Sequence, residues 1–331
     1  MTMSTSSVAF YLHDIPQDLL VRDIEPEHDW HYFGTGISCW IIQTYLRLRQ
    51  AGWSIELVST PPRTGIVIVH ADHMHTLLAS MQGLSKNLTI VCVRADRSKN
   101  LYADVEIVQN PTTANNKRTF FIHHWPQPGL IKRDRNRDQI IENIAYKGEH
   151  SQLNNAFQDQ EWVSHLGLRG IAWITDTVSW QGQRIMYENT MWNDYSKIDL
   201  VIAVRNDTNN LYNNKPASKL INSWLAGVPA LLGPESAYKQ LRRSPLDFIE
   251  VSSAAEALAA IDKLRNTPNL YEDMVENGIE RSKEFSSDRI CNTWAEFLFN
   301  TVHKHRTTIK GRIESHLPIG IRYHLRKIMG K

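Results

Sequence analysis

The sequence predicts an α/β protein built from two doubly wound domains. Short apolar runs that suit buried strands alternate with segments of helical periodicity along most of the 331 residues. This alternation is typical of parallel sheets whose strands are joined by right-handed crossover helices. A proline-rich and then highly charged stretch, residues 125–138, favours a division into two such units. The chain is long enough for each of them to bury its own core.

We therefore expect an N-terminal domain over residues 1–128, a linker over 129–139, a C-terminal domain over 140–300 and a basic tail over 301–331. In the N-terminal domain the pattern predicts helices at 37–50 and 73–82, and strands at 7–13, 55–58, 66–70, 89–93, 105–108 and 119–122. In the C-terminal domain it predicts strands at 140–146, 171–175, 200–204, 230–232 and 248–251, and helices at 153–166, 253–265, 270–285 and 288–303.

The composition excludes several classes of protein. An apolar fraction of 42% and a charged fraction of 22% are typical of soluble globular domains. No apolar run reaches the roughly 18 residues that a spanning helix needs, and the N-terminus lacks the pattern of a signal peptide. The three cysteines lie far apart and show no metal-binding spacing. We expect a cytoplasmic protein without a metal or other cofactor.

The last 31 residues carry most of the basic character of the chain. They hold one acid, Glu314, against eight basic residues: Lys304, Arg306, Lys310, Arg312, Arg322, Arg326, Lys327 and Lys331. Apolar residues alternate with these charges, as in helices that lie on anionic membrane surfaces. A helix that packs on the body of the protein with a solvated basic face would show the same pattern. Both interpretations stay open, and the first predicts peripheral membrane contact through residues 304–331.

A candidate binding helix begins at Pro216 and ends before Gly227. Its first turn carries Ser218 and Lys219, and Lys215 precedes it. The first N–H groups of a helix have no intrahelical partner, so this end of a helix favours anions such as phosphate. An ordinary packing helix with solvated lysines would have the same spacing.

The run from Lys219 to Ala230, KLINSWLAGVPA, resembles the donor-binding helix of GT-B glycosyltransferases. Those enzymes carry a lysine–leucine pair and later a pattern of the type Ala-x-Gly-x-Pro before a strand, and here Lys219-Leu220 is followed by Ala226-Gly227-Val228-Pro229. The resemblance implies two Rossmann-like domains that face a cleft, with the acceptor on the N-terminal domain and a nucleoside-diphosphate sugar on the C-terminal domain. No metal is implied.

In the N-terminal domain, strand ends and one glycine turn supply the candidates. Gly34 and Gly36 open a helix and resemble the glycine-rich turn near the donor phosphates in GT-B enzymes. Arg94 stands where many retaining members have a histidine that contacts the sugar, which implies a catalytic position. Asp96 is either a general base or the cap of a turn. His70 is either a hydrogen-bonded structural residue or part of the site.

In the C-terminal domain, Gly148-Glu149 stands where the family often has Gly-Arg, a reversal of charge. Asn214 and Asn222 occupy the positions of a glutamate pair; asparagine can hydrogen-bond a ribose but cannot act as a base. Arg205, Lys215 and Lys219 could replace the diphosphate-binding cations, with Ser218 and Asn222 completing the donor site.

The expected function is metal-independent transfer of a sugar from a nucleotide-sugar donor to a saccharide or lipid-linked acceptor, and cell-surface polysaccharide or glycolipid synthesis is the process that we expect it to serve. Two alternatives stay open: a catalytically silent GT-B-fold partner subunit, suggested by the lost glutamate pair, and a nucleotide-sugar epimerase. No recognised nucleic-acid-binding motif is present.

Overall fold

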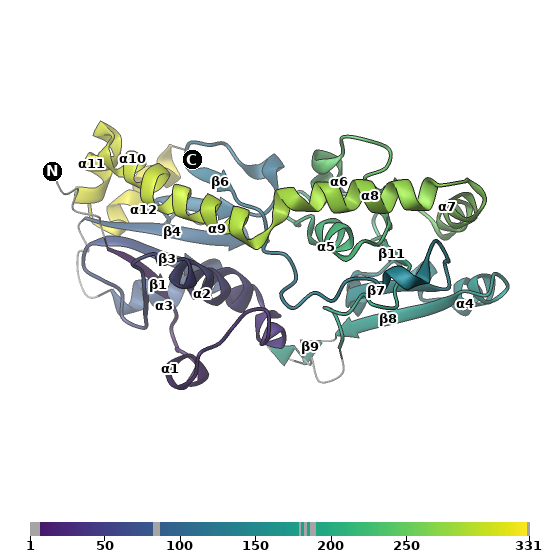
Figure 1. Ribbon diagram of the computed structural model, residues 1–331. Coiled ribbons are helices and arrows are strands. Elements are labelled where there is room, and N and C mark those ends of the chain that lie inside the picture. Colours follow the sequence, from purple (N-terminus) through teal and green to yellow (C-terminus); the bar gives the residue numbers. More distant parts are fainter. Residues whose placement is uncertain (1–6, 82–86, 179, 182–183, 186–189, 330–331) are drawn as a thin grey trace. The chain divides into compact units, whose positions relative to one another are not determined.

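The chain folds into two compact units. A computed structural model describes residues 7–81, 87–178, 180–181, 184–185 and 190–329. Unit 1 consists of residues 1–125 and 287–331, and unit 2 consists of residues 126–286 (Figure 1). The expected boundary at residue 300 is therefore wrong, because residues 287–300 form helix α9 (Ser287–Glu296) and a π-helix that pack into the core of unit 1.

Unit 1 contains a parallel six-stranded sheet in the order β2-β1-β3-β4-β5-β6. Its strands are β1 (Val8–Tyr11), β2 (Glu56–Val58), β3 (Gly65–His70), β4 (Leu88–Ala95), β5 (Val105–Val108) and β6 (Thr119–Phe121). Its helices are α1 (Asp18–Val21), α2 (Gln43–Gln50), α3 (Met74–Ser80), α9, α10 (Val302–Thr307), α11 (Ile309–His316) and α12 (Ile319–Ile328). A π-helix, Ser38–Ile42, leads into α2 without a break, so the expected helix over 37–50 is confirmed.

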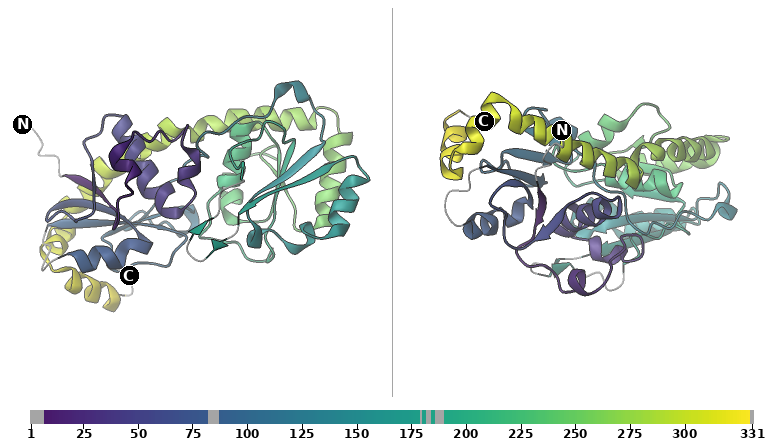
Figure 2. Two further views of the ribbon diagram at one scale, coloured as in Figure 1. Left: turned by 90° about the horizontal axis from the view of Figure 1, so that it is seen from below. Right: turned by 60° about the vertical axis from the view of Figure 1, so that its left-hand side comes forward.

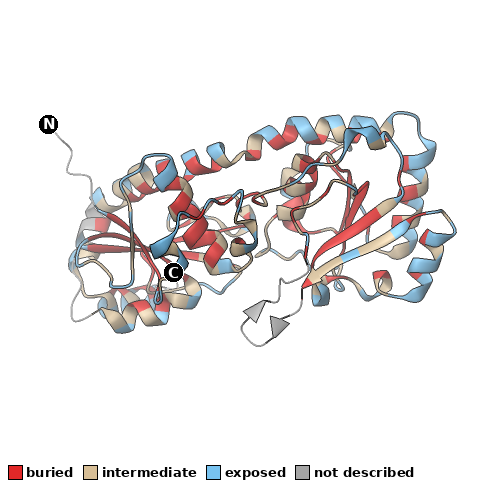
Figure 3. Ribbon diagram, turned by 60° about the horizontal axis from the view of Figure 1, so that its bottom comes forward, coloured by how far each residue is buried: buried red, intermediate tan, exposed pale blue. Residues whose placement is uncertain are grey.

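The sheet of unit 1 is covered on both faces, which explains why its central strands are uninterrupted apolar runs. On one face, Trp40 and Leu46 meet Trp294 of α9. On the other face, α3 supplies Met74 and Leu77. Figure 3 shows the result, with buried strands and helices whose outer sides are exposed.

Unit 2 contains a parallel five-stranded sheet in the order β13-β12-β11-β7-β8. Its strands are β7 (Asn143–Glu149), β8 (Ala172–Val178), β11 (Leu200–Ala203), β12 (Ala230–Leu232) and β13 (Ile249–Glu250), and β9 (Trp180–Gln181) pairs separately with β10 (Arg184–Ile185). Its helices are α4 (Gln160–Gly167), α5 (Ser218–Ala226), α6 (Ser236–Leu241), α7 (Ala254–Asn266) and α8 (Leu270–Ser282). Two doubly wound parallel sheets are the predicted fold class.

The segment expected to be a linker, residues 129–139, is packed into unit 2. The side chain of Asp199 is fully buried and binds both Arg133 and Arg137. The same carboxylate accepts hydrogen bonds from the N–H groups of Glu142 and Asn143, at 2.9 and 2.8 Å. These contacts hold the chain before the sheet, so β7 begins at Asn143 and not at the expected residue 140.

The C-terminal segment is also part of the body of unit 1. Helices α11 and α12 (yellow in Figure 2) lie beside the sheet, and Ile319 packs on its α3 face. Arg322 and Arg326 point inward and bind the buried carboxylate of Asp104, with closest distances of 3.0 and 2.5 Å. The segment therefore packs on the body of unit 1, as one of the two interpretations expected, but two of its arginines lie in a buried ion cluster and not on a solvated basic face.

We predict that Asp104→Asn strongly destabilises unit 1. Burial alone would raise the pKa of Asp104, but the guanidinium groups of Arg326 and Arg322 outweigh burial and lower it. Removing this carboxylate breaks one ion pair of each of two buried arginines, and breaking a buried ion pair typically costs about 3–5 kcal/mol. Denaturant unfolding and limited proteolysis of α12 measure the loss. Asp23→Asn is the control, because that carboxylate is 93% exposed. Equal stability of the two variants would contradict the prediction.

Candidate functional site

The strand order of unit 2 reverses between β7 and β11. The chain runs from β7 to β8 on one side, then returns to add β11, β12 and β13 on the other. In open parallel sheets, ligands bind outside the carboxyl ends of the strands at such a reversal. Here the carboxyl end of β7 carries Gly148 and Glu149, that of β11 leads to Arg205, and the N-terminus of α5 carries Ser218 and Lys219. The structure thus gathers residues from three separate segments at one edge of the sheet.

Lys219 reaches from α5 to the end of β7. Its Nζ donates a hydrogen bond to the carbonyl of Lys147 at 2.7 Å and lies 5.1 Å from the ring centroid of Tyr146. A Cβ on Gly148 would lie only 2.6 Å from this Nζ, so a glycine at this position leaves room for the ammonium group. Burial, followed by the nearby charge of Arg205, lowers the pKa of Lys219 to about 8. Burial disfavours the charged form of this lysine, and an anion bound beside it would stabilise that charge.

Arg205 forms the second cation of the site. Its Nε lies 3.1 Å from a carboxylate oxygen of Glu235, its Nη1 donates to Gln152, and its guanidinium lies 5.0 Å from the ring centroid of Tyr212. Glu235 is 2% exposed and follows β12 as the N-cap of α6. Sequence reasoning missed Glu235. A carboxylate in Gly233-Pro234-Glu235, directly after a strand and before a helix, was the available signal.

The other donor-site candidates of unit 2 lie around these cations. Lys215 precedes α5, and its N–H donates to the carbonyl of Tyr212 at 2.9 Å. The carboxylate of Glu149 accepts a hydrogen bond from Ser151 Oγ at 2.7 Å. Asn222 lies one turn after Ser218, and its Oδ1 accepts the N–H of Gln127 at 3.0 Å. The side-chain oxygen of Asn222 therefore binds the start of unit 2 in this structure.

The candidates of unit 1 lie at two places on its sheet. Gly34 and Gly36 flank the turn that enters the π-helix before α2. Arg94 lies near the end of β4, 3.9 Å from the buried carboxylate of Glu106. Asp96 follows β4 and forms an ion pair with Arg97 at 3.0 Å. The catalytic roles of Arg94 and Asp96 stay predictions.

The site chemistry of unit 2 is that of an anion-binding edge. Two cations and the N-terminus of α5 converge there, while Glu235 offsets part of the charge of Arg205. Among the described residues, no group of three or more His, Cys, Asp or Glu side chains is placed to hold a metal ion. The arrangement suits a diphosphate bound by helix dipole, ammonium and guanidinium.

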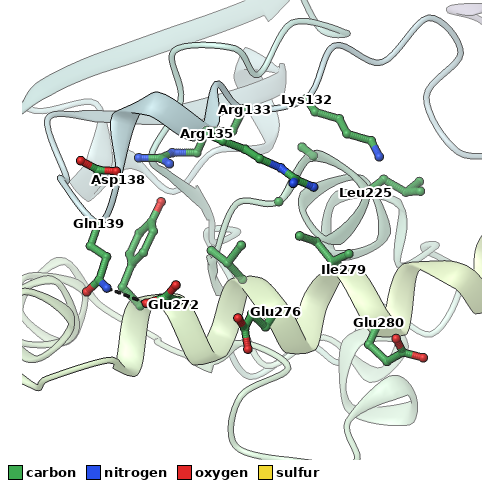
Figure 4. A pocket seen from close by; sticks show the side chains of 14 residues that line it. Lys132, Arg133, Arg135, Asp138, Gln139, Leu225, Glu272, Glu276, Ile279 and Glu280 are labelled. Atoms are coloured by element: carbon green, nitrogen blue, oxygen red, sulfur yellow. Dashed lines mark hydrogen bonds between the residues drawn. The ribbon is translucent and has the colours of Figure 1, made fainter.

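A second pocket of about 680 Å³ lies at the opposite end of α5 (Figure 4). Leu225 and Ile279 line it. Residues 132–139 add cations such as Lys132 and Arg135, and α8 adds carboxylates such as Glu272 and Glu276. A helix C-terminus carries partial negative charge, and the two walls carry opposite charges, so this pocket lacks the positive character of the Lys219 site. It is separate from the candidate donor site.

We predict that Arg205→Ala destabilises unit 2 and that adding Glu235→Gln restores much of the loss. The single change leaves the buried Glu235 carboxylate without its cation, whereas the double change removes both charges. Thermal unfolding of the two variants, compared with Glu235→Gln alone, gives the coupling between the residues. Additive losses would show that the ion pair contributes nothing to the stability of the site.

Comparisons with known proteins identify the fold. No protein-family model matches the sequence, and no curated protein matches it. Solved structures do match over nearly the whole chain. Sucrose-phosphate synthase from Thermosynechococcus elongatus matches with a TM-score of 0.57 at 12% identity, covering 90% of this chain and 99% of that one.

Two further structures agree. Anabaena HepE in complex with UDP-glucose matches with a TM-score of 0.54 at 12% identity, covering 88% of this chain and 99% of the other. A glycosyltransferase from Rickettsia africae matches with a TM-score of 0.55 at 7% identity, covering 91% and 100%. With its two doubly wound parallel sheets, the chain has the GT-B fold of glycosyltransferases.

Proposed function

We propose that the protein is a glycosyltransferase that takes its sugar from a nucleoside-diphosphate donor. The observation that carries the proposal is the site at the strand reversal of unit 2, where Lys219, Arg205 and the N-terminus of α5 converge. HepE, a protein of the same fold, binds UDP and UDP-glucose. A nucleoside diphosphate is the class of ligand whose charge these groups fit.

In this proposal the cations act most strongly as the bond to the sugar breaks. Negative charge then develops on the departing diphosphate, and preorganised donors stabilise it without reorganisation. Lys219 supplies an ammonium group at the end of β7, and Arg205 is already oriented by Glu235 and Gln152. These cations take the place of the arginine that the family often carries after its glycine. The reaction needs no metal in this scheme.

We predict that binding of UDP weakens as pH rises from 7 to 9 and that Lys219→Ala weakens it at pH 7. The protonated ammonium binds phosphate and is lost as pH passes the pKa of about 8. The terminal phosphate itself titrates at about pH 6, so it stays ionised throughout this range. A charged hydrogen bond is worth roughly 1.5–3 kcal/mol, which corresponds to about a tenfold loss or more. Calorimetric titration measures the affinities.

Two variants control this experiment. Lys219→Arg keeps a permanent charge, so its affinity should no longer fall with pH. Lys263→Ala removes an exposed lysine of α7 and should bind UDP as the unaltered protein does. If Lys219→Ala binds UDP unchanged, the donor site lies elsewhere. If no nucleoside diphosphate or nucleotide sugar binds the folded protein, a non-catalytic role is favoured. Release of free UDP from UDP-sugars only when an acceptor is added would separate a transferase from an epimerase.

We also propose that α12 contacts an anionic membrane surface through its apolar side. With Arg322 and Arg326 turned inward, the outer side of α12 presents Ile321, Leu325 and Ile328, which are 48%, 40% and 82% exposed. Exposed Lys327 adjoins this apolar side. An apolar stripe with adjacent positive charge suits the interface of an anionic bilayer. Among the described residues, no helix combines the length and the hydropathy that spanning a bilayer requires.

We predict that replacing Ile321, Leu325 and Ile328 together by serine abolishes binding to vesicles that contain phosphatidylglycerol. Each of these side chains is exposed, so the variant should keep its fold. Sedimentation with vesicles measures binding, and Leu168→Ser is the control because Leu168 is 84% exposed in unit 2. Deleting residues 304–331 would be less clean, since it strips Asp104 of its arginines. Vesicle binding by the triple variant equal to that of the control would contradict the proposal.

A further inference from the structure

The pocket at the C-terminal end of α5 plays no part in the candidate donor site. Its volume of about 680 Å³ lies in the range of cavities that bind small molecules. All of its lining residues belong to unit 2. Residues 132–139 form the first wall, α8 forms the second, and the end of α5 completes the pocket (Figure 4). The pocket therefore needs nothing from unit 1.

The pocket contains an apolar strip made of Leu225, Val275 and Ile279. Leu225 and Val275 are partly buried and pack against the core of unit 2. Ile279 lies one helical turn after Val275 and is 36% exposed, so part of its apolar surface faces water. Gly227 has no side chain to cover it: a Cβ there would lie 3.7 Å from Ile279 Cδ1. The strip can therefore take the hydrocarbon part of a ligand out of water.

The first wall carries two cations that no carboxylate neutralises directly. Lys132 and Arg135 are exposed, and among the described residues neither side chain forms an ion pair or a hydrogen bond. Arg133 differs from them, because Asp199 binds its guanidinium at 2.9 Å and only 7% of its side chain is exposed. Asp138 lies on the same wall and offsets one of the two free charges. The first wall is therefore positive overall.

The second wall presents a row of carboxylates. Glu272, Glu276 and Glu280 stand at every fourth position of α8, so they lie on one side of the helix. Glu280 pairs with Lys283 at 2.5 Å, and Glu272 accepts a hydrogen bond from Gln139. In the part of the chain that the structure describes, the carboxylate of Glu276 has no such partner. Like charges at this spacing repel one another, so the row favours a cation beside Glu276.

One end of the pocket is closed by a contact between its walls. Gln139 Nε2 donates a hydrogen bond to Glu272 at 2.8 Å, drawn as the dashed line in Figure 4. A helix or an extended peptide could not pass this end without breaking that bond. The closed end and the volume of the pocket therefore favour a small molecule over a segment of a partner protein.

We propose that this pocket binds a small zwitterionic amphiphile. Its anionic group would meet Lys132 and Arg135, its ammonium group would meet Glu276, and its hydrocarbon part would cover the apolar strip. The free charges of the two walls are opposite and form no ion pair with each other, so a ligand with both charges can bridge them. A diphosphate would face the carboxylate row, which disfavours it. The inference goes beyond the proposed function and does not depend on it.

Methyl NMR of the full-length protein at pH 7 tests the proposal with 8-aminooctanoate as the probe. This molecule carries an anionic group, an ammonium group and a hydrocarbon chain. Octanoate and octylamine are matched probes, because each of them lacks one of the two charges. The methyl signals of Leu225, Val275 and Ile279 should shift with 8-aminooctanoate. The singly charged probes should bind about two- to fivefold more weakly, the loss expected for one solvent-exposed ion pair.

Two variants identify which wall holds which charge. Glu276→Gln should weaken binding of 8-aminooctanoate and of octylamine but not of octanoate. Arg135→Gln should weaken binding of 8-aminooctanoate and of octanoate but not of octylamine. Both residues are exposed, so both variants should keep their fold. Glu161→Gln is the control, because that carboxylate of α4 is 85% exposed and lies outside the pocket.

Four results would overturn the proposal. The first is the absence of methyl shifts with 8-aminooctanoate, and the second is equal binding of all three probes. The third is binding of 8-aminooctanoate that neither Glu276→Gln nor Arg135→Gln changes. The fourth is a dimer in analytical ultracentrifugation that Glu276→Gln dissociates, which would show that a second copy of the chain covers the pocket. Binding of UDP at Lys219 is measured separately, so none of these results decides the proposed function.

Discussion

Parallel pairing of the strands is the constraint on which the rest of this structure depends. Every strand of the two main sheets runs parallel to its neighbours, so each connection must cross over a face of the sheet. Crossovers cover both faces, which requires strands that are apolar on both sides. They also bring all carboxyl ends of the strands to one edge. In each unit the strand order reverses once, and that reversal collects residues that are distant in the sequence: Gly148, Arg205 and Lys219 in unit 2, and His70 with the glycine turn in unit 1.

Buried carboxylates determine where irregular segments attach to these sheets. Asp104 holds α12 through two arginines, and Asp199 holds residues 133–143. Asp247 accepts two backbone N–H groups and binds Arg281 at 2.6 Å. A buried charge is tolerated only when it is paired and hydrogen-bonded, so each of these carboxylates fixes the position of its partners. Basic residues that look like solvent-exposed charge in the sequence are therefore structural in several places.

The same electrostatics distinguish the two cations at the candidate donor site. Arg205 is paired with Glu235, which orients the guanidinium and offsets part of its charge. Lys219 has a carbonyl and an aromatic ring as neighbours, so burial lowers the pKa of its ammonium group to about 8. An incoming diphosphate would gain more binding energy from Lys219 than from Arg205, because Glu235 already pairs with Arg205 whereas the contacts of Lys219 are a carbonyl and an aromatic ring. In the proposed function an anion would bind beside Lys219 at the end of β7, where the absence of a side chain at Gly148 leaves room for the ammonium group.

The sequence by itself determined the fold class, most strand positions and the helix that carries Lys219. These features follow from local periodicity and from Pro216 and Gly227 at the ends of one helix; Gly227 adopts the left-handed conformation expected of a helix terminator, with φ of 71°. The sequence also identified the glycine turn and Arg205 as candidates, because the ends of strands can be read from local patterns.

Only the tertiary structure decided which charges face inward and which segments belong together. Arg322 and Lys327 lie in the same basic segment, yet Arg322 is 1% exposed whereas Lys327 is exposed. Arg322 is buried because it binds Asp104, and this partner lies more than two hundred residues away in the chain, so local patterns cannot indicate it. Local sequence patterns likewise did not predict the pairing of Glu235 with Arg205 or the hydrogen bond between Asn222 and Gln127. Each of these contacts depends on a partner from another segment. The return of residues 287–331 to unit 1 rests on contacts such as that of Trp294 with Trp40. Local patterns encode the elements, whereas pairing across the sequence depends on complementary charge and shape that appear only when the chain is folded.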